Sequence, residues 1–154
     1  NSFRMKVVIQ RVSKASVIID KKVVAYIAKG LLVLLGIEEA DGQEDIAWLC
    51  GKLSKLRIFN DENDIMNLSI QDVDGDIIVV SQFTLHASTK KGNRPSYIKA
   101  AKPESAIPLY ESFVIKLQEE LGKKVQTGEF GAMMDLEFIN TGPVTIIIDS
   151  KNRQ

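Results

Sequence analysis

The run Ile77-Ile78-Val79-Val80 restricts the possible folds more than any other stretch of the sequence. β-Branched residues favour strands, and a strand made only of apolar residues is typical of one buried on both faces. Asp74-Gly75-Asp76, a hairpin-type turn signal, precedes the run, and the apolar pattern stops after it. We therefore predict a central strand with protein packed against both of its faces.

Hydrophobic patterning predicts further short strands on both sides of this run. They are expected at Met5–Val12, Ala15–Ile19, Val23–Ile27, Leu31–Leu35, Arg57–Phe59, Met66–Leu68, Val125–Gly128, Leu136–Ile139 and Val144–Ile148. Apolar residues at helical spacing predict one helix at Gly42–Leu56, with Cys50 in the core, and a second from Pro103 or Ser105 to Leu121. The fold class is α+β: a single domain with a curved, barrel-like, mixed or antiparallel sheet and two main helices.

Single residues of two types limit the chemistry. Cys50 and His86 are the only cysteine and histidine, which excludes an intrachain disulfide and a thiolate zinc cage. A Ser-His-Asp triad is excluded unless His86 serves alone or a second subunit contributes another. We expect no metal and no cofactor. Lys plus Arg and Asp plus Glu number 20 each, so any nucleic acid must be held by a local patch.

The 154 residues fit one domain. We expect residues 5–150 to form it, residues 1–4 to be a remnant of an expression vector, and residues 151–154 to be a tail. No apolar run approaches the ~20 residues of a membrane span. The cytoplasm is therefore the expected location, with no membrane partner.

Ser81, Gln82 and Thr84 follow the central strand directly. Small polar residues at a strand end usually satisfy backbone groups, and these three residues alone favour that interpretation over catalysis. The next stretch, Ser88–Lys102, is the longest polar segment. Its cations could track a phosphate backbone or form a solvated loop, and its position beside the central motif favours function. The candidates for nucleic-acid binding are Lys90, Lys91, Arg94, Lys99 and Lys102.

Gly142-Pro143 interrupts the two last strands. The dipeptide removes one side chain and one amide hydrogen, which leaves carbonyl oxygens as the local polar groups. Composition favours a plain trans turn, although X-Pro is the one bond type that is cis in about 5 to 6% of cases. Asn140 and Thr145 flank the turn with groups that could hold it in place.

Two motifs carry a family resemblance. Ser81-Gln82-Phe83-Thr84-Leu85 and Asn140-Thr141-Gly142-Pro143-Val144-Thr145 resemble the two signatures of the D-aminoacyl-tRNA deacylase family. Framework matches in the family's order are Gln10-Arg11-Val12, Gly30 to Gly36, Arg57-Ile58-Phe59, Met66-Asn67-Leu68, Arg94-Pro95-Ser96 and Gln126-Thr127-Gly128.

The resemblance implies a cytoplasmic homodimer with its active site at the subunit interface. Such an enzyme hydrolyses the ester that joins a D-amino acid, or glycine, to the terminal ribose of tRNA, and rejects L-aminoacyl-tRNA. Gly142-Pro143 matches the family's Gly-cisPro dipeptide, which enters the partner subunit's site. Arg11 matches the arginine that supports this dipeptide. No family role is assigned to His86, which we expect to be a loop residue.

For the chemistry, we expect the main-chain N–H groups of Phe83 and Thr84 to stabilise the ester oxyanion. Ser81 and Gln82 would orient the substrate. Thr84 is a possible nucleophile; the alternative, which we favour, is attack by water helped by the 2'-hydroxyl of the substrate. A rival hypothesis of another class is a nucleic-acid-binding adaptor with the same fold and no turnover.

Overall fold

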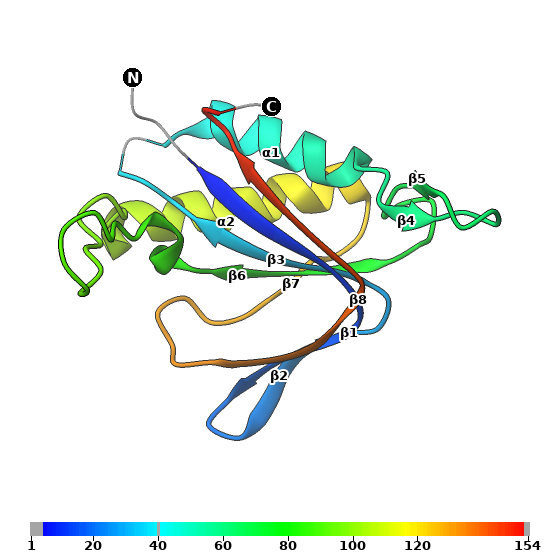
Figure 1. The fold of residues 1–154 in the computed structure, drawn as a ribbon, viewed down its shortest axis with the longest axis horizontal. Coiled ribbons are helices and arrows are strands. Elements are labelled where there is room, and N and C mark those ends of the chain that lie inside the picture. The colour runs from blue at the N-terminus through cyan, green and yellow to red at the C-terminus, as the bar shows by residue number, and fades with distance from the viewer. Residues whose placement is uncertain (1–4, 40, 153–154) are drawn as a thin grey trace.

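A computed structural model of the protein describes residues 5–39 and 41–152 (Figure 1). The N-terminal segment Asn1–Arg4 and the last two residues of the expected tail lie outside the described residues. The elements are β1 Lys6–Ile19, β2 Lys22–Ile27, β3 Gly30–Gly36, α1 Gln43–Lys55, β4 Phe59–Asn60, β5 Met66–Leu68, β6 Asp76–Ser81, the 3-10 helix η1 Phe83–His86, α2 Pro103–Leu121, β7 Gln126–Thr127 and β8 Asp135–Asp149.

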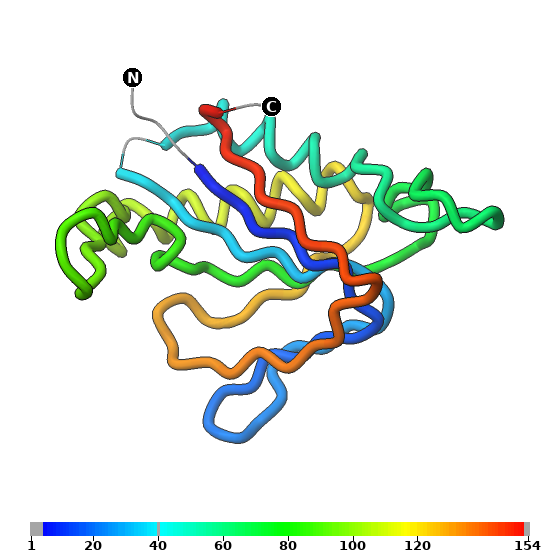
Figure 2. Tube along the Cα trace, viewed as in Figure 1, coloured from blue at the N-terminus to red at the C-terminus, as the bar shows by residue number. Residues whose placement is uncertain are grey.

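Six strands form one mixed sheet in the order β2-β1-β3-β6-β7, with β8 paired to β1. The β3–β6 and β6–β7 pairs are parallel, and β1 runs antiparallel to its three neighbours. The sheet curls, so that β2 comes round towards β7, as the tube in Figure 2 shows. The α+β, barrel-like fold with two helices is therefore confirmed.

The strands β1 and β8 are longer than predicted. The expected break between Val12 and Ala15 is wrong, because β1 is continuous and its pairing with β8 shifts register there instead. No Gly or Pro lies between these residues to end the strand. The two last predicted strands are likewise one element, β8. Its pairing with β1 skips from Asn140 to Thr145, so the predicted interruption survives as a break in the ladder.

Apolar side chains cover both faces of β6, as predicted. Ile77 and Val79 belong to the core between the sheet and the two helices, which lie together on one side of it (Figure 1). Ile78 and Val80 belong to a second core inside the barrel. All four residues are at most 2% exposed. The turn before β6 is not a hairpin, because β6 pairs in parallel with β3 and β7.

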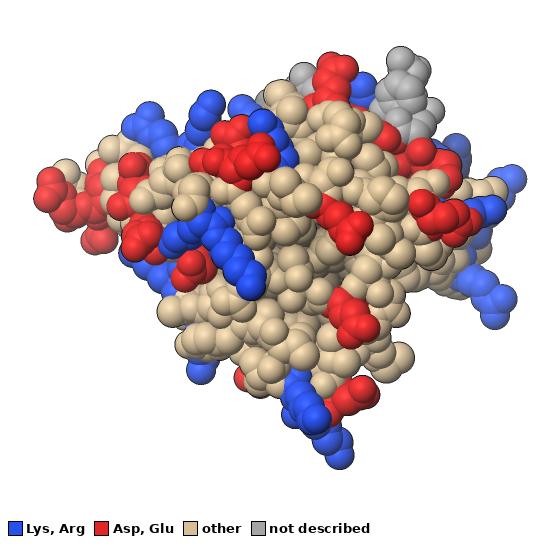
Figure 3. Space-filling model, turned by 180° about the vertical axis from the view of Figure 1, so that it is seen from behind, with Lys and Arg blue, Asp and Glu red and all other residues tan. Residues whose placement is uncertain are grey.

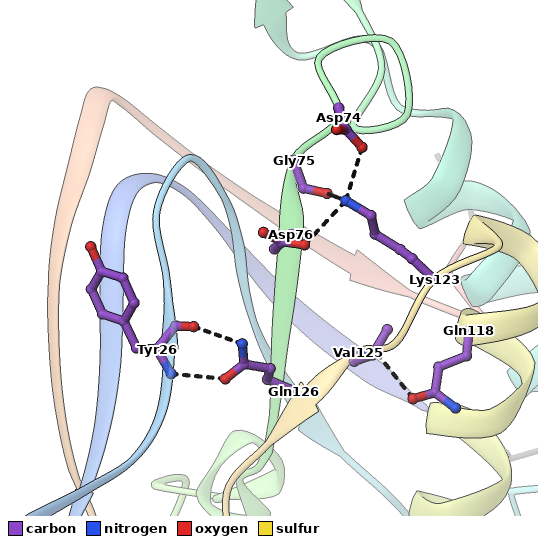
Figure 4. A network of polar contacts seen from close by, with 8 residues as sticks. All are labelled: Tyr26, Asp74, Gly75, Asp76, Gln118, Lys123, Val125 and Gln126. Carbon is purple, nitrogen blue, oxygen red and sulfur yellow. Dashed lines mark hydrogen bonds and ion pairs between the residues drawn. The ribbon is translucent and has the colours of Figure 1, made fainter.

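A side chain closes the barrel between β2 and β7 (Figure 4). The Gln126 amide accepts from the Tyr26 N–H at 2.8 Å and donates to the Tyr26 carbonyl at 2.7 Å. The side chain thus replaces one pair of backbone hydrogen bonds between neighbouring strands. Nearby, the Lys123 ammonium contacts Asp74 and Asp76, at 3.0 and 3.1 Å, and ties the turn after α2 to the start of β6.

The helices form close to where the pattern places them. At the start of α1, the Asp45 carboxylate accepts from the Gly42 N–H at 3.1 Å. Cys50 is fully buried, as predicted. The helix α2 begins at Pro103 and ends before Gly122, whose φ of 71° is left-handed. In the described part of the chain, neither helix is long and apolar enough to cross a membrane.

Candidate functional site

A pocket of about 310 Å³ lies at the end of β6. We call it the β6 pocket. Ser81, Gln82 and Phe83 line it, because β6 ends at Ser81 and the chain turns at once into η1. Phe130 and Met134, from the segment after β7, line it as well. The predicted motif is therefore at a cavity that is large enough for a small organic group.

The side chains of the motif contact one another at the mouth of the β6 pocket. The Gln82 amide contacts the Thr84 hydroxyl, and the Gln82 N–H donates to the Leu35 carbonyl of β3 at 2.8 Å. Thr84 is exposed. The one side chain that bonds the Thr84 hydroxyl among the described residues is an amide, and an amide is no base.

The first N–H groups of η1 face no carbonyl within the helix, because the preceding residues lie outside it. The later amides of Leu85 and Ala87 donate to Gln82 and Thr84 carbonyls at 3.3 and 3.1 Å. The amides of Phe83 and Thr84 have no such bond among the described residues. Phe83 itself packs edge-on against Tyr97, with ring centroids 4.9 Å apart.

The second motif forms a supported turn within β8. The Gly142–Pro143 bond is cis, so the plain trans turn favoured by composition is wrong and the isomer is the one that the resemblance implies. Arg11 lies beneath it. Its guanidinium donates to the Thr141 carbonyl at 3.0 Å and to the Ile58 carbonyl at 2.8 Å. The φ of Gly142 is 120°, a conformation that favours glycine, and a Cβ there would also crowd the hydrogen-bonded guanidinium.

Flanking side chains also hold this turn. The Asn140 amide donates to Gln10 at 2.8 Å and to the Thr145 hydroxyl at 3.0 Å, while its oxygen accepts from the Val144 N–H at 3.1 Å. The buried guanidinium on one side and this network on the other leave Gly142 and Pro143 exposed. The dipeptide therefore projects from the surface on a rigid base.

The two motifs do not meet within one chain. Arg11 pairs with Leu31, which pairs with Ile77, whereas the first motif begins at Ser81. Four residues along β6 separate these positions, or about 13 Å at roughly 3.3 Å per residue. In Figure 1, η1 and the middle of β8 accordingly lie towards opposite ends of β3 and β6. The separation agrees with the resemblance, which implies that Gly142-Pro143 enters the site of a partner subunit.

His86 is not the loop residue that we expected. It ends η1 and is 5% exposed, because η1 turns its ring inwards. Its Nδ1 lies 3.3 Å from a Glu38 carboxylate oxygen. Burial lowers the pKa of His86, against the raising effects of the Gly36 carbonyl and of Glu38. The ring packs against Gly36 and is engaged with Glu38, so it does not serve Thr84 as a base.

The predicted basic residues lie on an exposed loop between η1 and α2. Two backbone bonds of 2.8 Å between Ser88 and Ser96 pinch the loop at its base. On the face seen in Figure 3, carboxylates gather at the end that carries β4 and β5, charged side chains ring the margin, and much of the centre is uncharged. Within residues 5–39 and 41–152, no group of three His, Cys, Asp or Glu could hold a metal ion.

Three residues that line the β6 pocket or close the barrel beside it were not predicted as such from the sequence. Phe130 had no assigned role. Met133-Met134 could line a pocket or fill the core, and the core was favoured for at least one of the two. Gln126 was noted only as part of a framework match. The Gln-Thr-Gly tripeptide was the available signal for Gln126, because a polar residue within a short strand needs a partner. Nothing local marks Phe130 and Met134 as pocket residues, because the barrel closure places them there.

The fold is a curled barrel that presents two supported motifs on separate surfaces. These features define the protein as a deacylase-type α+β barrel, the class that the sequence resembles. The sequence profile described as D-Tyr-tRNA(Tyr) deacylase matches residues 8–149. The chain belongs to this family.

Curated relatives are similar to this chain in sequence, and solved structures are similar to it in fold. Proteins named D-aminoacyl-tRNA deacylase from Flavobacterium johnsoniae, Flavobacterium psychrophilum and Bacteroides fragilis are 70%, 71% and 64% identical to this chain, over 97% of it and 100% of each relative. A structure titled c-Myc DNA Unwinding Element Binding Protein is 37% identical with a TM-score of 0.87, covering 93% of this chain and 97% of its own. A probable eukaryotic D-amino acid tRNA deacylase, 18% identical with a TM-score of 0.82, covers 95% and 99% and shares the fold.

Proposed function

We propose that the chain hydrolyses the ester bond of D-aminoacyl-tRNA, and of glycyl-tRNA, as a homodimer that rejects L-aminoacyl-tRNA. Its family makes it a D-aminoacyl-tRNA deacylase, a hydrolase. The products are free amino acid and tRNA. The tRNA substrate supports the cytoplasm as the proposed location. The composite site, the chirality check and the dimer are inferred from the geometry of the two motifs.

The separation of the two motifs is the observation that supports a shared site. One chain carries the β6 pocket beside the unpaired main-chain amides of η1, and about 13 Å away along the sheet it displays a supported turn that does not line this pocket. A second subunit can insert its Gly142-Pro143 turn at the β6 pocket, and receive one in return. Two equivalent sites result, as the symmetry of a twofold dimer requires.

The exposed turn suits selection by configuration. An enzyme that clears many D-amino acids cannot rely on contacts to one side chain, so it must sense the α-carbon. Carbonyl oxygens on a rigid base can accept the α-ammonium in one configuration and crowd the side chain in the other. Glycine has no side chain to crowd and passes. Discrimination is thus achieved by exclusion.

For the chemistry, the unpaired amides of Phe83 and Thr84 stabilise the oxyanion that forms when the ester is attacked. Such a donor commonly contributes ~2.7 to 4 kcal/mol to the transition state. Ser81 and Gln82 line the same pocket and orient the ester. Neither a metal nor a cofactor enters the proposed mechanism.

Water assisted by the ribose 2'-hydroxyl is the better candidate for the attacking step than Thr84. A threonine nucleophile needs a base within hydrogen-bond reach. The Thr84 hydroxyl contacts the Gln82 amide instead, and His86 is buried beside Glu38. Thr84 therefore lines the site and positions Gln82.

The tRNA body needs cations outside the β6 pocket. The loop from η1 to α2 supplies them, and all five are exposed. They are Lys90, Lys91, Arg94, Lys99 and Lys102. Arg11, Asn140 and Thr145 act on the turn and not on the RNA.

The deciding experiment compares D-tyrosyl-tRNA with L-tyrosyl-tRNA. We expect the purified protein to release D-tyrosine and to leave the L-ester intact. Binding of tRNA with release of neither amino acid would support the adaptor instead. For the shared site, mixed dimers that combine a Gly142→Ala subunit with a subunit altered at η1 should regain D-selective hydrolysis, because one of the two composite sites is intact. Mixed dimers no more active than their parents would contradict that design.

The attacking group is tested separately. Thr84→Ala should retain most of the single-turnover rate, whereas tRNA ending in 2'-deoxyadenosine should be cleaved far more slowly. Collapse of activity in Thr84→Ala together with normal cleavage of the deoxy substrate would reverse the assignment.

A further inference from the structure

A second cavity, of about 380 Å³, lies next to the β6 pocket. We call it the basic pocket. Leu85, His86 and Ala87 line it, whereas Phe83 lines the β6 pocket. The short helix η1 thus contributes residues to both cavities, and at about 2 Å per residue Phe83 and Ala87 are roughly 8 Å apart. A strand that leaves the β6 pocket can therefore reach the basic pocket by crossing η1.

Cations from β1 and from both ends of one loop converge on this cavity. Lys6 comes from β1, Lys90 from the start of the loop and Lys99 from its end. The Lys6 ammonium donates to the Leu85 carbonyl at 3.5 Å. Lys90 and Lys99 make no hydrogen bond or ion pair with any described residue. The one carboxylate that lines the pocket, Glu38, is 8% exposed and is engaged with His86.

Backbone bonds at both ends of the loop position these lysines. Ser88 pairs with Ser96, and the Ala101 N–H donates to the Ile37 carbonyl at 2.9 Å. Ser88 and Thr89, which carry hydroxyl groups, also line the cavity. A cavity with excess positive charge and hydroxyl donors, in a chain whose total charge is balanced, has the chemistry of a phosphate site.

We propose that the basic pocket binds a backbone phosphodiester of the RNA strand whose terminal ribose carries the ester in the β6 pocket. This inference rests on the proposed function and divides the five loop cations. Lys90 and Lys99, together with Lys6, contact the phosphate. Lys91, Arg94 and Lys102 do not line the pocket. The strand is held on both sides of η1, so the ester is aligned with the η1 amides.

The test uses two substrates that share the ester and differ in phosphate. D-Tyrosyl-tRNA has the strand, and D-tyrosyl-adenosine has none. We expect the double variant Lys90→Ala/Lys99→Ala to lose about tenfold in kcat/KM on the tRNA and to keep the wild-type value on the adenosine ester. The slope of log kcat/KM against log salt should become less negative by about 0.7 for each lost contact. Lys55→Ala, an exposed lysine in the last turn of α1, is the matched control.

Each outcome supports or overturns the proposed phosphate site. Equal slowing of both substrates would place the lysines in the ester site and overturn the proposal, as would an unchanged rate on tRNA. Rescue by Lys90→Arg/Lys99→Arg is expected, because charge is retained; failure of rescue with normal folding would also overturn it. Inorganic phosphate that inhibits the adenosine ester as strongly as the tRNA would indicate a free anion site instead. A wild type that cleaves neither substrate would refute the proposed function itself.

Discussion

The Gln126 amide offers a direct test of how closure of the barrel shapes the site. Gln126→Ala removes both bonds to Tyr26, of 2.8 and 2.7 Å (Figure 4). A hydrogen bond contributes about 0.5 to 1.5 kcal/mol net, and the freed Tyr26 groups can be hydrated because the contact is exposed. We therefore expect the free energy of unfolding to fall by about 1 to 2 kcal/mol. For a chain of this size that lowers Tm by about 2–4 °C per kcal/mol.

The same change should alter the β6 pocket. The segment after β7 carries Phe130 and Met134 into the lining, and Gly128 packs so closely that an added Cβ would lie 2.5 Å from the Met134 sulfur. If Gln126 positions this segment, its loss should raise KM for D-aminoacyl-tRNA several-fold while kcat changes less. Binding is affected because the pocket wall moves, whereas the η1 amides stay in place.

Urea unfolding and steady-state kinetics measure the two effects. Gln71→Ala is the control, because the Gln71 amide makes one exposed bond, to the Glu120 carbonyl at 3.1 Å, away from the pocket. It should cost less stability and leave KM unchanged. Gln126→Glu keeps the acceptor and loses the donor, and should fall between wild type and Gln126→Ala. The reasoning fails if Gln126→Ala matches Gln71→Ala in both stability and KM.

Two other changes have defined outcomes. Gly142→Ala puts a Cβ against the Arg11 guanidinium at a φ of 120°, so the turn or the guanidinium beneath it must shift. The ratio of D-tyrosyl-tRNA to L-tyrosyl-tRNA cleavage should then fall, and an unchanged ratio would argue against the turn as selector. Burial raises the pKa of Cys50 from 9.0 to about 12, so folding retains a proton that the unfolded chain loses, and stability falls as pH rises. Between about pH 8 and about pH 10, the free energy of unfolding of the wild type, measured in urea, should fall by about 1.4 kcal/mol more than that of Cys50→Ala. Equal decreases in the two proteins would contradict this.

Local patterns predicted the elements that depend on local interactions. The helices α1 and α2 begin and end within a residue or two of the expected positions, because apolar spacing and caps lie in adjacent turns. The burial of β6 on both faces followed from four consecutive β-branched residues. Strand lengths that depend on a distant partner were predicted wrongly. The strands β1 and β8 are continuous because each pairs with the other along most of its length.

His86 shows the same limit within the site. Its neighbours in sequence suggested a loop, but η1 turns it towards Glu38 and Gly36, which follow or end β3. The position of Lys6 was even less predictable from the sequence. It lies 84 residues before Lys90 in the chain, and only the packing of β1 beside the loop brings their side chains to one cavity.

By itself, the sequence determined which groups are available: two signature motifs, an arginine, a basic loop, and no second histidine or cysteine. These are properties of residues and of short spacings. The tertiary structure decided where those groups act. It set the motifs about 13 Å apart along the sheet, buried Arg11 beneath an exposed turn, and closed the barrel through one amide. Such placements depend on strand register and on contacts between distant segments, and neither is encoded in local spacing.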